Sequence, residues 1–343
     1  MCHCEQETKM TELVDAYGRK VDYLRISLTD RCNLRCRYCM PKEGIGGIGH
    51  ERILTLEEIL RVARILTEMG VRRIRITGGE PLVRRNVLYL IRQLGTLPGQ
   101  PELTLTTNGV LLEEVLPEIL AAGLHSINIS LDTLDREVYR ELTGTDALER
   151  VLRGMEKALE MGMQVKLNTV PIRGINEKEL TVLAGLARDR GIAVRFIELM
   201  PIGCAKDLRG IPGEEILHIL EDEYGSAEPE GGTPGVSELQ KEARGPARYY
   251  HFRGFQGNVG FIDPLSHSFC SSCNRVRLTS DGRLKLCLYY PEGPDLREML
   301  RGGCSDEELK QAITRELIYK PECHSFINPS EGKDSRNMNE IGG

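Results

Sequence analysis

Three cysteines lie close together near the start of the sequence, in the arrangement Cys32-x3-Cys36-x2-Cys39. Three thiolates at this spacing can hold one face of a metal centre. A closed zinc site takes four ligands, and the nearest further candidate, His50, lies eleven residues beyond Cys39. A [4Fe–4S] cluster bound by three cysteines leaves one iron open to a substrate or cofactor. The spacing therefore favours a cluster with an open iron over an incomplete zinc knuckle.

A second triplet, Cys270-x2-Cys273-x13-Cys287, occurs in the C-terminal part of the chain. His267 is close enough in sequence to complete a zinc site. Because only three cysteines are again supplied, we prefer a second [4Fe–4S] cluster with an open iron.

Basic residues on expected strands suggest what these centres face. They are Arg25, Arg75, Lys166, Arg275 and Arg277. The last two alternate with a valine and so share one face of a strand. A charge that faces the interior of a barrel is costly unless it is paired, and the guanidinium fork suits phosphate. Five such cations predict a polyanionic ligand.

Two glycine-rich segments differ in their context. Thr77-Gly78-Gly79-Glu80-Pro81 follows an expected strand, and its glycines allow a ligand to approach the backbone closely. The segment 44–49 matches G-x-G-x-x-G, but no strand directly precedes it and no helix opens directly after it. A dinucleotide site requires both, so we reject that interpretation. A plain strand-to-helix turn is the alternative for residues 77–81.

The elements that must position these residues alternate between strand-like and helix-like segments from residue 22 to residue 200. The expected strands cover 22–29, 72–77, 102–107, 126–131, 164–170 and 193–199, and the expected helices cover 56–69, 86–95, 111–122, 147–161 and 177–190. Such units form a parallel sheet with right-handed crossovers, here either a doubly wound sheet or an open partial barrel. The first triplet follows the first strand, at the edge where active sites of such folds lie.

Local signals refine this outline. Thr55 with Glu58, and Asn176 with Glu179, predict capping boxes at two helix starts. Residues 247–290 look rich in β-structure, and Asp281-Gly282 predicts a two-residue hairpin turn. Helices are expected at 213–225, 294–301 and 305–319.

We divide the chain into an N-terminal tail (1–14), a barrel (15–210), a C-terminal region with the second triplet (211–319) and a tail (320–343).

Composition narrows the class of protein. The 343 residues contain 45 Lys+Arg and 51 Asp+Glu, a net charge of −6, which disfavours a broad nucleic-acid surface. No apolar run is long enough for a membrane helix, and the polar start MCHCEQETKM lacks the apolar region of a signal peptide. We expect a cytoplasmic protein whose eleven cysteines do not form disulfides. Five of them receive no role: Cys2, Cys4, Cys204, Cys304 and Cys323.

The motifs resemble those of one family nearly from end to end. CNLRCRYC resembles the cysteine motif of the radical S-adenosylmethionine (SAM) superfamily, and the whole chain resembles the GTP 3′,8-cyclases of molybdenum cofactor biosynthesis. The most specific segments are LRISLTDRCNLRCRYCMP, RITGGEPLVR, TTNG, SLDT, FIELMPIG, CSSCNRVRLTSDGRLKLCL and the terminal Ile341-Gly342-Gly343. The resemblance implies an α/β fold, an incomplete (β/α)6 TIM-like barrel with a smaller β-rich cluster-binding region and terminal helices.

The resemblance also implies roles for individual residues. SAM binds the open iron of the first cluster, near Tyr38, Gly78, Gly79, Glu80, Ser130 and Met200. GTP contacts Arg25, Arg75, Thr106, Lys166, Arg275, Val276 and Arg277, and its guanine binds the open iron of the second cluster. The terminal Gly342 and Gly343 reach the active site.

In the implied reaction, a 5′-deoxyadenosyl radical removes the hydrogen at C3′ of GTP. The C3′ radical then attacks C8 of guanine, and the resulting aminyl radical is reduced by one electron and protonated. The implied partners are an external one-electron reductant, a downstream cyclic pyranopterin monophosphate synthase and a second copy of the chain. Two alternatives stay open. One is a radical SAM peptide or sulfatase maturase with an auxiliary cluster, and the other is a non-enzymatic iron–sulfur or zinc sensor or scaffold.

Overall fold

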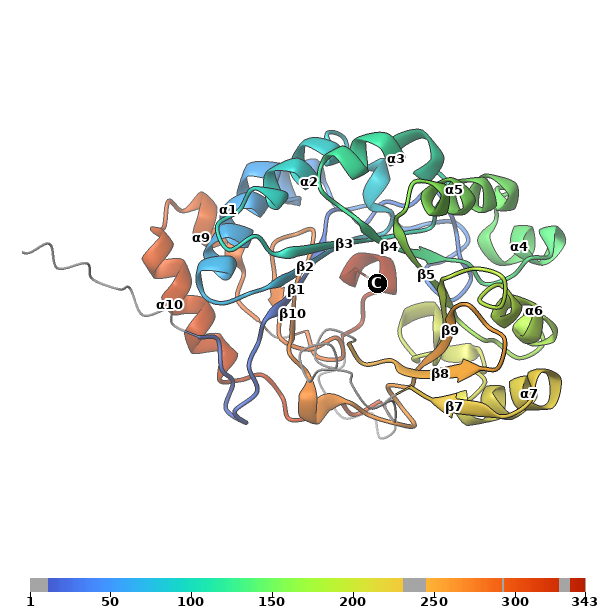
Figure 1. Ribbon diagram of the computed structural model, residues 1–343. Coiled ribbons are helices and arrows are strands. Elements are labelled where there is room, and N and C mark those ends of the chain that lie inside the picture. Colours follow the sequence, from blue (N-terminus) through green and yellow to red (C-terminus); the bar gives the residue numbers. More distant parts are fainter. Residues whose placement is uncertain (1–11, 231–244, 292, 327–333, 343) are drawn as a thin grey trace, which may run out of the picture.

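A computed structural model describes residues 12–230, 245–291, 293–326 and 334–342. Its centre is an eleven-stranded sheet in the order β11-β10-β1-β2-β3-β4-β5-β6-β9-β8-β7 (Figure 1). The strands are β1 (Tyr23–Ser27), β2 (Arg73–Thr77), β3 (Glu102–Thr107), β4 (Ser126–Ser130), β5 (Gln164–Thr169), β6 (Ala193–Ile197), β7 (Ala227–Pro229), β8 (Arg248–Phe252), β9 (Asn258–Ile262), β10 (Arg275–Leu278) and β11 (Leu284–Lys285).

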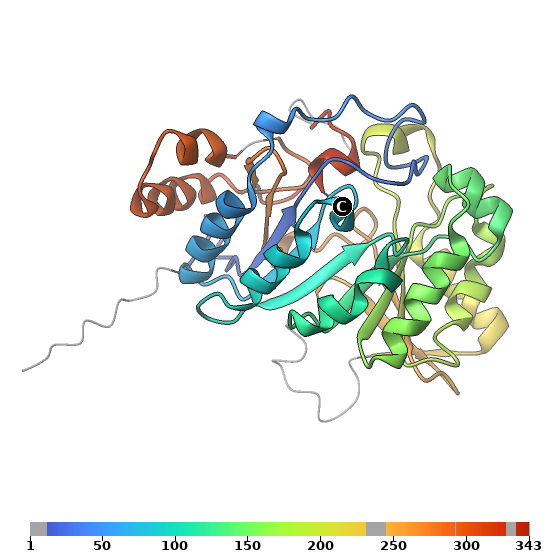
Figure 2. The ribbon, with the colours of Figure 1, turned by 90° about the horizontal axis from the view of Figure 1, so that it is seen from above.

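Strands β1 to β6 run parallel in chain order, and helices cover the outer side of the sheet (Figure 2). The helices are α1 (Leu56–Glu68), α2 (Val87–Gly95), α3 (Leu112–Ala121), α4 (Arg136–Thr143), α5 (Leu148–Glu160), α6 (Leu180–Gly185), α7 (Gly213–Tyr224), α9 (Leu296–Arg301), α10 (Asp306–Leu317) and α11 (Met338–Ile341). The sheet curves without closing, which confirms the predicted partial barrel.

The C-terminal strands extend both edges of this curved sheet. Strand β10 pairs in parallel with β1, and β9 pairs in parallel with β6. The expected β-rich region thus adds to the barrel sheet at its two ends. The pairing places Arg277 opposite Arg25, which in turn lies opposite Arg75 on β2.

Alternation along the strands separates the core from the inner face. Leu24 and Ile26 on β1, and Ile74 and Ile76 on β2, are fully buried in the hydrophobic core. The residues between them, such as Arg25, project to the opposite face of the sheet. A strand pattern of this kind buries apolar residues under the helices and presents polar residues to the inside of the curve.

Two local predictions at helix starts have different outcomes. The capping box of Thr55 and Glu58 is confirmed at the start of α1. The one predicted for Asn176 and Glu179 is wrong, because Asn176 makes no capping hydrogen bond there. Its side-chain oxygen accepts from the amide of Ile172 instead, at 2.7 Å.

The carboxylate of Glu179 accepts hydrogen bonds from the amides of Leu134 and Asp135, at 2.7 and 3.0 Å. These amides lie just before α4, a helix that the sequence analysis missed. The helix expected over 177–190 is accordingly shorter: a 3-10 turn, Glu177–Glu179, precedes α6.

The hairpin between β10 and β11 also differs from its prediction. Leu278 lies opposite Leu284, and the amide of Thr279 donates to the carbonyl of Arg283 at 2.9 Å. Three residues, 280–282, therefore form the turn instead of two. Gly282 has φ +90°, which fits a three-residue hairpin that ends in a left-handed residue.

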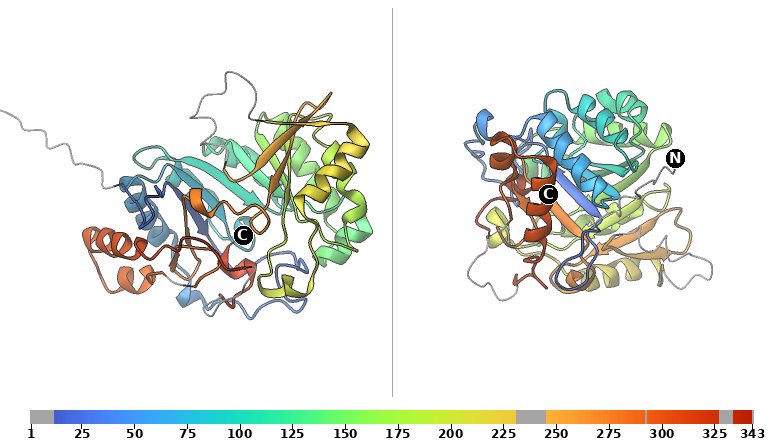
Figure 3. Two further views of the ribbon diagram at one scale, coloured as in Figure 1. Left: turned by 90° about the horizontal axis from the view of Figure 1, so that it is seen from below. Right: turned by 90° about the vertical axis from the view of Figure 1, so that its left-hand side faces the viewer.

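Helices α9 and α10 pack on the outside of the barrel beside α1, whereas the C-terminal segment turns into the curve of the sheet (Figure 3). Arg61 and Arg64 on α1 both form ion pairs with Asp306, at 2.7 and 2.5 Å. No helix in the described parts of the chain is long and apolar enough to cross a membrane.

Candidate active site

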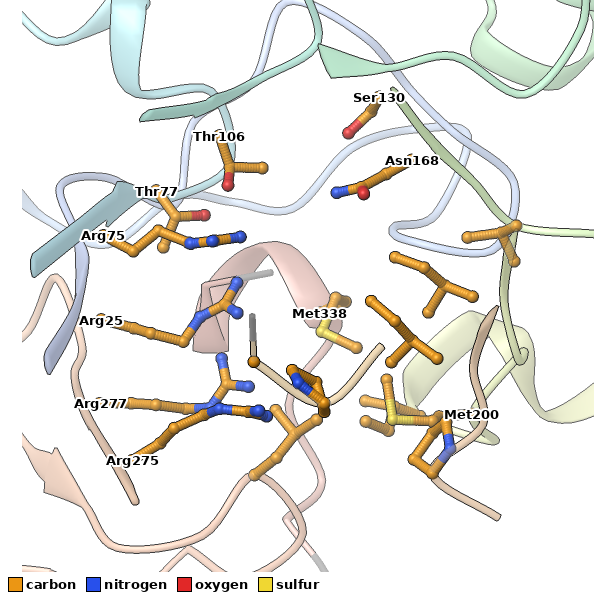
Figure 4. Close-up of a pocket in the computed structure, with 18 of the residues that line it drawn as sticks. Arg25, Arg75, Thr77, Thr106, Ser130, Asn168, Met200, Arg275, Arg277 and Met338 are labelled. Carbon is orange, nitrogen blue, oxygen red and sulfur yellow. The ribbon is translucent and has the colours of Figure 1, made fainter. Parts of the chain in front are cut away.

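A cavity of about 370 Å³ opens inside the curve of the sheet (Figure 4). Its lining includes all six cysteines of the two triplets, together with residues from β1 to β6, from β10 and from α11. The fold therefore gathers into one chamber residues that lie more than two hundred positions apart in sequence. Both triplets therefore face the same cavity.

The first triplet lies in the loop that follows β1. The thiol of Cys32 accepts from the amide of Leu34 at 3.4 Å and from the side-chain amide of Asn108 at 3.7 Å. Burial raises the pKa of the Cys32 thiol, and burial together with neighbouring thiols raises the pKa of Cys39 to about 12. These thiols therefore need a cation such as iron to become thiolates.

Tyr38, between the last two cysteines of this triplet, is anchored by its hydroxyl group. The hydroxyl donates to a carboxylate oxygen of Asp132 at 2.8 Å. The other oxygen of Asp132 accepts from the amide of Val170 at 2.8 Å. Burial raises the pKa of Asp132 to about 6, although both hydrogen bonds lower it. Asp132, which the sequence analysis left without a role, thus fixes the ring that faces the cavity.

The Gly-Gly-Glu segment follows β2. Gly78 and Gly79 line the cavity, and a Cβ atom on Gly79 would overlap the carbonyl oxygen of Arg31. Glycine is required at this close approach between two loops.

Glu80 is fully buried, and its carboxylate accepts from the amides of Leu82 and Asn108 at 3.0 and 2.7 Å and from the hydroxyl of Thr107 at 2.8 Å. Burial raises the pKa of Glu80 to about 7. Its carboxylate braces the loop that carries Asn108, which reaches Cys32.

Ser130 at the end of β4 and Met200 after β6 both line the cavity. Figure 4 shows them at the side away from the arginines, with Asn168 beside Ser130. The side-chain oxygen of Asn168 is buried and has no hydrogen-bond partner among the described residues. A polar ligand group at this end would satisfy it.

Basic side chains crowd the opposite end of the cavity. Figure 4 shows Arg25, Arg75, Arg275 and Arg277 side by side, with their guanidinium groups pointing inward. Burial and Arg275 lower the pKa of Arg277 to about 10. Burial and the neighbouring arginines lower the pKa of Arg25 well below its usual value.

Among the described residues, seven arginine and lysine side chains line the cavity: Arg25, Arg73, Arg75, Lys166, Arg195, Arg275 and Arg277. The Nε atoms of three of them, Arg75, Arg195 and Arg275, are buried without a hydrogen-bond partner in the described structure. Buried donors of this kind are normally satisfied by a partner, and a polyphosphate would supply acceptors and negative charge together.

Two of these seven cations, Arg73 and Arg195, were not predicted to bind a ligand. Arg73 forms an ion pair with Asp22 at 3.2 Å, and Arg195 donates to the side-chain oxygen of Asn128 at 2.6 Å. Their positions on β2 and β6 matched the inward-facing pattern of Arg75 and Lys166. That pattern was the signal by which the sequence could have identified them.

Tyr23 forms a platform beneath this cluster. The guanidinium carbons of Arg73, Arg75 and Arg275 lie 5.4, 5.6 and 6.0 Å from the centre of its ring. Although burial opposes it, the arginines lower the pKa of the Tyr23 hydroxyl. Cation–π contacts of this kind orient guanidinium groups that would otherwise repel one another.

The remaining predicted ligand contacts fall on both faces of the sheet. Thr106 and Lys166 line the cavity. Val276 does not, because its side chain is buried in the core between the helices and the sheet. The side chain of Val276 therefore cannot contact a ligand in the cavity.

The second triplet lines the same cavity, and Cys273 and Cys287 lie near Arg277. Cys270 begins a 3-10 turn, Cys270–Ser272, and Cys287 follows β11. Burial raises the pKa of Cys270, but His324 and Ser268 outweigh it and lower the pKa to about 7. His324 also bonds the carbonyl of Pro264 through Nε2, at 2.7 Å. The sequence analysis missed His324 because it lies 54 residues from Cys270 and no spacing pattern joins the two.

His267, the candidate fourth zinc ligand, points elsewhere. Its ring lies 3.4 Å from the carboxylate of Glu214 and does not line the cavity.

The cysteine geometry tests which kind of metal centre the residues fit. Among the described residues, no three His, Cys, Asp or Glu side chains lie close enough to hold one metal ion. A tetrahedral zinc site with Zn–S bonds of about 2.3 Å needs its sulfurs within roughly 4 Å of one another. A [4Fe–4S] cubane binds one thiolate at each corner iron, so its ligands are more widely spaced. Each triplet supplies three thiols and no fourth ligand, and this donor set fits a cluster with an open iron better than a closed zinc site.

The C-terminal segment enters the same chamber. The carbonyl of Gly342 accepts from Nη1 of Arg277 at 2.9 Å, and Met338 and Asn339 line the cavity. Gly342 has φ +90°, and a Cβ atom there would lie 2.6 Å from Cβ of Ser27. Only glycine fits this position. Gly343 lies outside the described residues.

A buried ion pair anchors this segment to the hairpin. Lys285, fully buried on β11, pairs with Asp334, which also accepts from the amide and side chain of Arg336 at 3.0 and 2.9 Å. Although burial opposes it, these bonds lower the pKa of Asp334 to about 2.

We expect Asp334→Ala to release residues 334–342, because it leaves Lys285 buried without its partner, at a cost of about 3–5 kcal/mol. Hydrogen–deuterium exchange should show faster exchange in that peptide and unchanged exchange in α1. Equal exchange of the peptide in both proteins would contradict the anchor. Glu298→Ala, at the exposed N-terminal turn of α9, is the matched control.

Two protein families match this chain, one over the region of the first cysteine triplet and one over the region of the second. The model described as "Radical SAM superfamily" matches residues 26–187, and the model described as "Molybdenum Cofactor Synthesis C" matches residues 192–326. The GTP 3′,8-cyclase of Clostridium perfringens (strain 13 / Type A) is 44% identical over 329 residues, covering 96% of this chain and 99% of the relative. That of Peptoclostridium acidaminophilum is 45% identical over 333 residues, covering 96% and 98%.

A solved structure supports the fold. Streptococcus suis SuiB bound to S-adenosylmethionine superposes with a TM-score of 0.57 at 16% identity, over 86% of this chain and 69% of that chain. At this identity the similarity concerns the fold alone.

Proposed function

Because this chain belongs to the family of GTP 3′,8-cyclases within the radical SAM superfamily, we propose how its cavity carries out that family's reaction. The enzyme converts GTP to (8S)-3′,8-cyclo-7,8-dihydroguanosine 5′-triphosphate, the first step of molybdenum cofactor biosynthesis. The observation that carries this conclusion is that the chain is about 44% identical to a GTP 3′,8-cyclase over 96% of its length. It sets aside the non-enzymatic scaffold and the peptide maturase.

The family uses a [4Fe–4S] cluster and SAM, and we assign the cluster to Cys32, Cys36 and Cys39. The bound pair supplies the radical that removes a hydrogen atom from the substrate. Gly78 and Gly79 offer backbone groups at the cavity wall, and Ser130 and Met200 line the same end. Glu80 contributes indirectly, because its carboxylate accepts a hydrogen bond from the amide of Asn108 and so holds the loop that contacts Cys32.

We assign a second [4Fe–4S] cluster to Cys270, Cys273 and Cys287, where its open iron would face the guanine of GTP. The row of Arg25, Arg75 and Arg277 across three neighbouring strands suits the triphosphate. Thr106, Lys166 and Arg275 add further donors, and Val276 contributes its backbone only.

This placement explains how the residues contribute to the reaction. The cations hold one end of GTP, while the first triplet holds SAM at the other end of the same chamber. C3′ of the ribose is thereby kept between the two centres, so much of the rate enhancement comes from positioning. The carbonyl of Gly342 accepts from one guanidinium donor of Arg277, which supports a position of the tail beside the proposed triphosphate site.

Several wider features belong to the same proposal. They are an external one-electron reductant, a downstream cyclic pyranopterin monophosphate synthase, a homodimer and a cytoplasmic location. We also propose the division into a tail (1–14), a barrel (15–210), a cluster region (211–319) and a second tail (320–343).

Anaerobic turnover tests the function directly. Reconstituted protein with SAM, dithionite and GTP should form 5′-deoxyadenosine together with an isomer of GTP, detected by mass spectrometry. ATP in place of GTP is the control and should give no cyclised product. SAM cleavage that leaves GTP unchanged would overturn the substrate, and no reaction at full iron content would overturn the activity.

A further inference from the structure

Lys320 is a buried cation that the reaction described above does not use. It follows α10 and is only 3% exposed. Its ammonium group donates to the carbonyls of Leu286 and Arg275 at 2.5 and 2.9 Å, and to the thiol of Cys273 at 3.7 Å. Lys320 therefore links the segment that carries Cys273 to the segment that carries Cys287, because Leu286 directly precedes Cys287.

No carboxylate among the described residues forms an ion pair with Lys320 within 4.0 Å. Asp15 acts on it only from a greater distance, and its carboxylate is already paired with Arg19. A buried ammonium is costly unless an anion compensates it. The nearest groups that can become anions are the thiols of the second triplet.

A second basic residue clamps the segment that carries Lys320. Arg19 donates to the carbonyls of Cys270, Pro321 and Glu322, at 2.7, 2.7 and 2.8 Å. It is held by Asp15 at 2.6 Å, and this pair is almost fully buried. The clamp ties the segment after Lys320 to the first cysteine of the triplet, so the ammonium group cannot turn away into solvent.

We propose that Lys320 is a positioning residue that supplies a fixed positive charge to the second cluster and raises its reduction potential. The inference rests on the proposed second cluster. Reduction adds one negative charge to a cluster, and a buried cation beside a ligating sulfur stabilises that charge. Hydrogen bonds to cluster sulfurs and net charge are the levers by which proteins set these potentials.

The test uses the full chain with Cys32, Cys36 and Cys39 all replaced by serine, so that only the second cluster can assemble. Lys320→Gln keeps a donor but removes the charge, and Lys320→Arg keeps the charge. We expect Lys320→Gln to lower the midpoint potential, measured by EPR-monitored redox titration. The expected change is at least tenfold in the reduction equilibrium, which is about 59 mV for a one-electron couple. Lys320→Arg should stay near the parent value.

Lys310→Gln is the matched control, because Lys310 is partly exposed on α10 and pairs with Glu68 at 3.0 Å. An unchanged potential in Lys320→Gln, or equal shifts in the Gln and Arg variants, would overturn the role of the charge. Loss of the cluster in both variants would show a structural role and overturn it too. If the parent with Lys320 intact binds no iron, the second cluster itself is wrong, which is a distinct failure.

Discussion

Cys36→Ser is expected to abolish the cleavage of SAM. Cys36 lies between the other two cysteines of the first triplet and lines the cavity. Burial raises the pKa of its thiol well above the usual value, and nearby thiols raise it further. Serine cannot replace a thiolate at this position, because its hydroxyl is far less acidic and a poor ligand for iron. The first cluster should fail to assemble or to reduce SAM.

The readout is 5′-deoxyadenosine, which should fall to background under anaerobic conditions with dithionite. Iron content should drop from about eight to about four atoms per chain, since the second triplet is intact. Cys304→Ser is the matched control: Cys304 is partly buried, and it does not line the cavity. Normal 5′-deoxyadenosine formation by Cys36→Ser would refute the assignment of the first cluster.

Arg277→Ala is expected to weaken the binding of GTP by about 10- to 100-fold, since a hydrogen bond to a charged group contributes roughly 1.5–3 kcal/mol. Arg277 is opposite Arg25 in the parallel ladder of β10 and β1, and its guanidinium lies inside the cavity. Arg275→Ala should act in the same direction. Neither arginine binds a cluster, so iron content should be unchanged.

Calorimetry of reconstituted protein with GTP measures this effect without turnover. Arg153→Ala provides the control, because Arg153 is 55% exposed on the outer surface and pairs with Glu113. Unchanged affinity in both cavity variants would refute the placement of the triphosphate. A loss of iron together with affinity would instead assign these arginines to the support of the second cluster.

The barrel could be predicted from the sequence because its strands and helices follow local patterns. Each of the six expected barrel strands is present, shifted by at most two residues. The cysteine spacings and the Gly-Gly-Glu segment are also local patterns, so the sequence alone could indicate which chemistry they support. The capping box predicted for Asn176 and Glu179 is absent, because local spacing does not determine which amides a side chain reaches. A carboxylate such as Glu179 bonds to whichever amides the fold brings near, here those of Leu134 and Asp135.

Long-range contacts account for the rest of the site. Lys320 and His324 approach the second triplet only because residues after α10 fold back over it. The alternating pattern predicts that Arg195 faces inward, but its approach to the cations of β1 and β2 follows from the curvature of the sheet, which no spacing in the sequence encodes. The contact of Gly342 with Arg277 likewise spans 65 residues.

The pairing of β1 with β10 has a consequence for synthesis on the ribosome. Strand β1 cannot pair with β10 until about 250 further residues have been translated. The hydrogen bond from the side chain of Asn274 to the carboxylate of Asp22 shows this separation in sequence. Until then one edge of β1 is open, and open edges are templates for pairing with other chains. Non-local strand pairing also slows folding. The emerging chain therefore passes through a long interval in which the first cysteine loop is complete but the chamber around it is not, and during that interval the open edge of β1 is exposed to pairing with other chains.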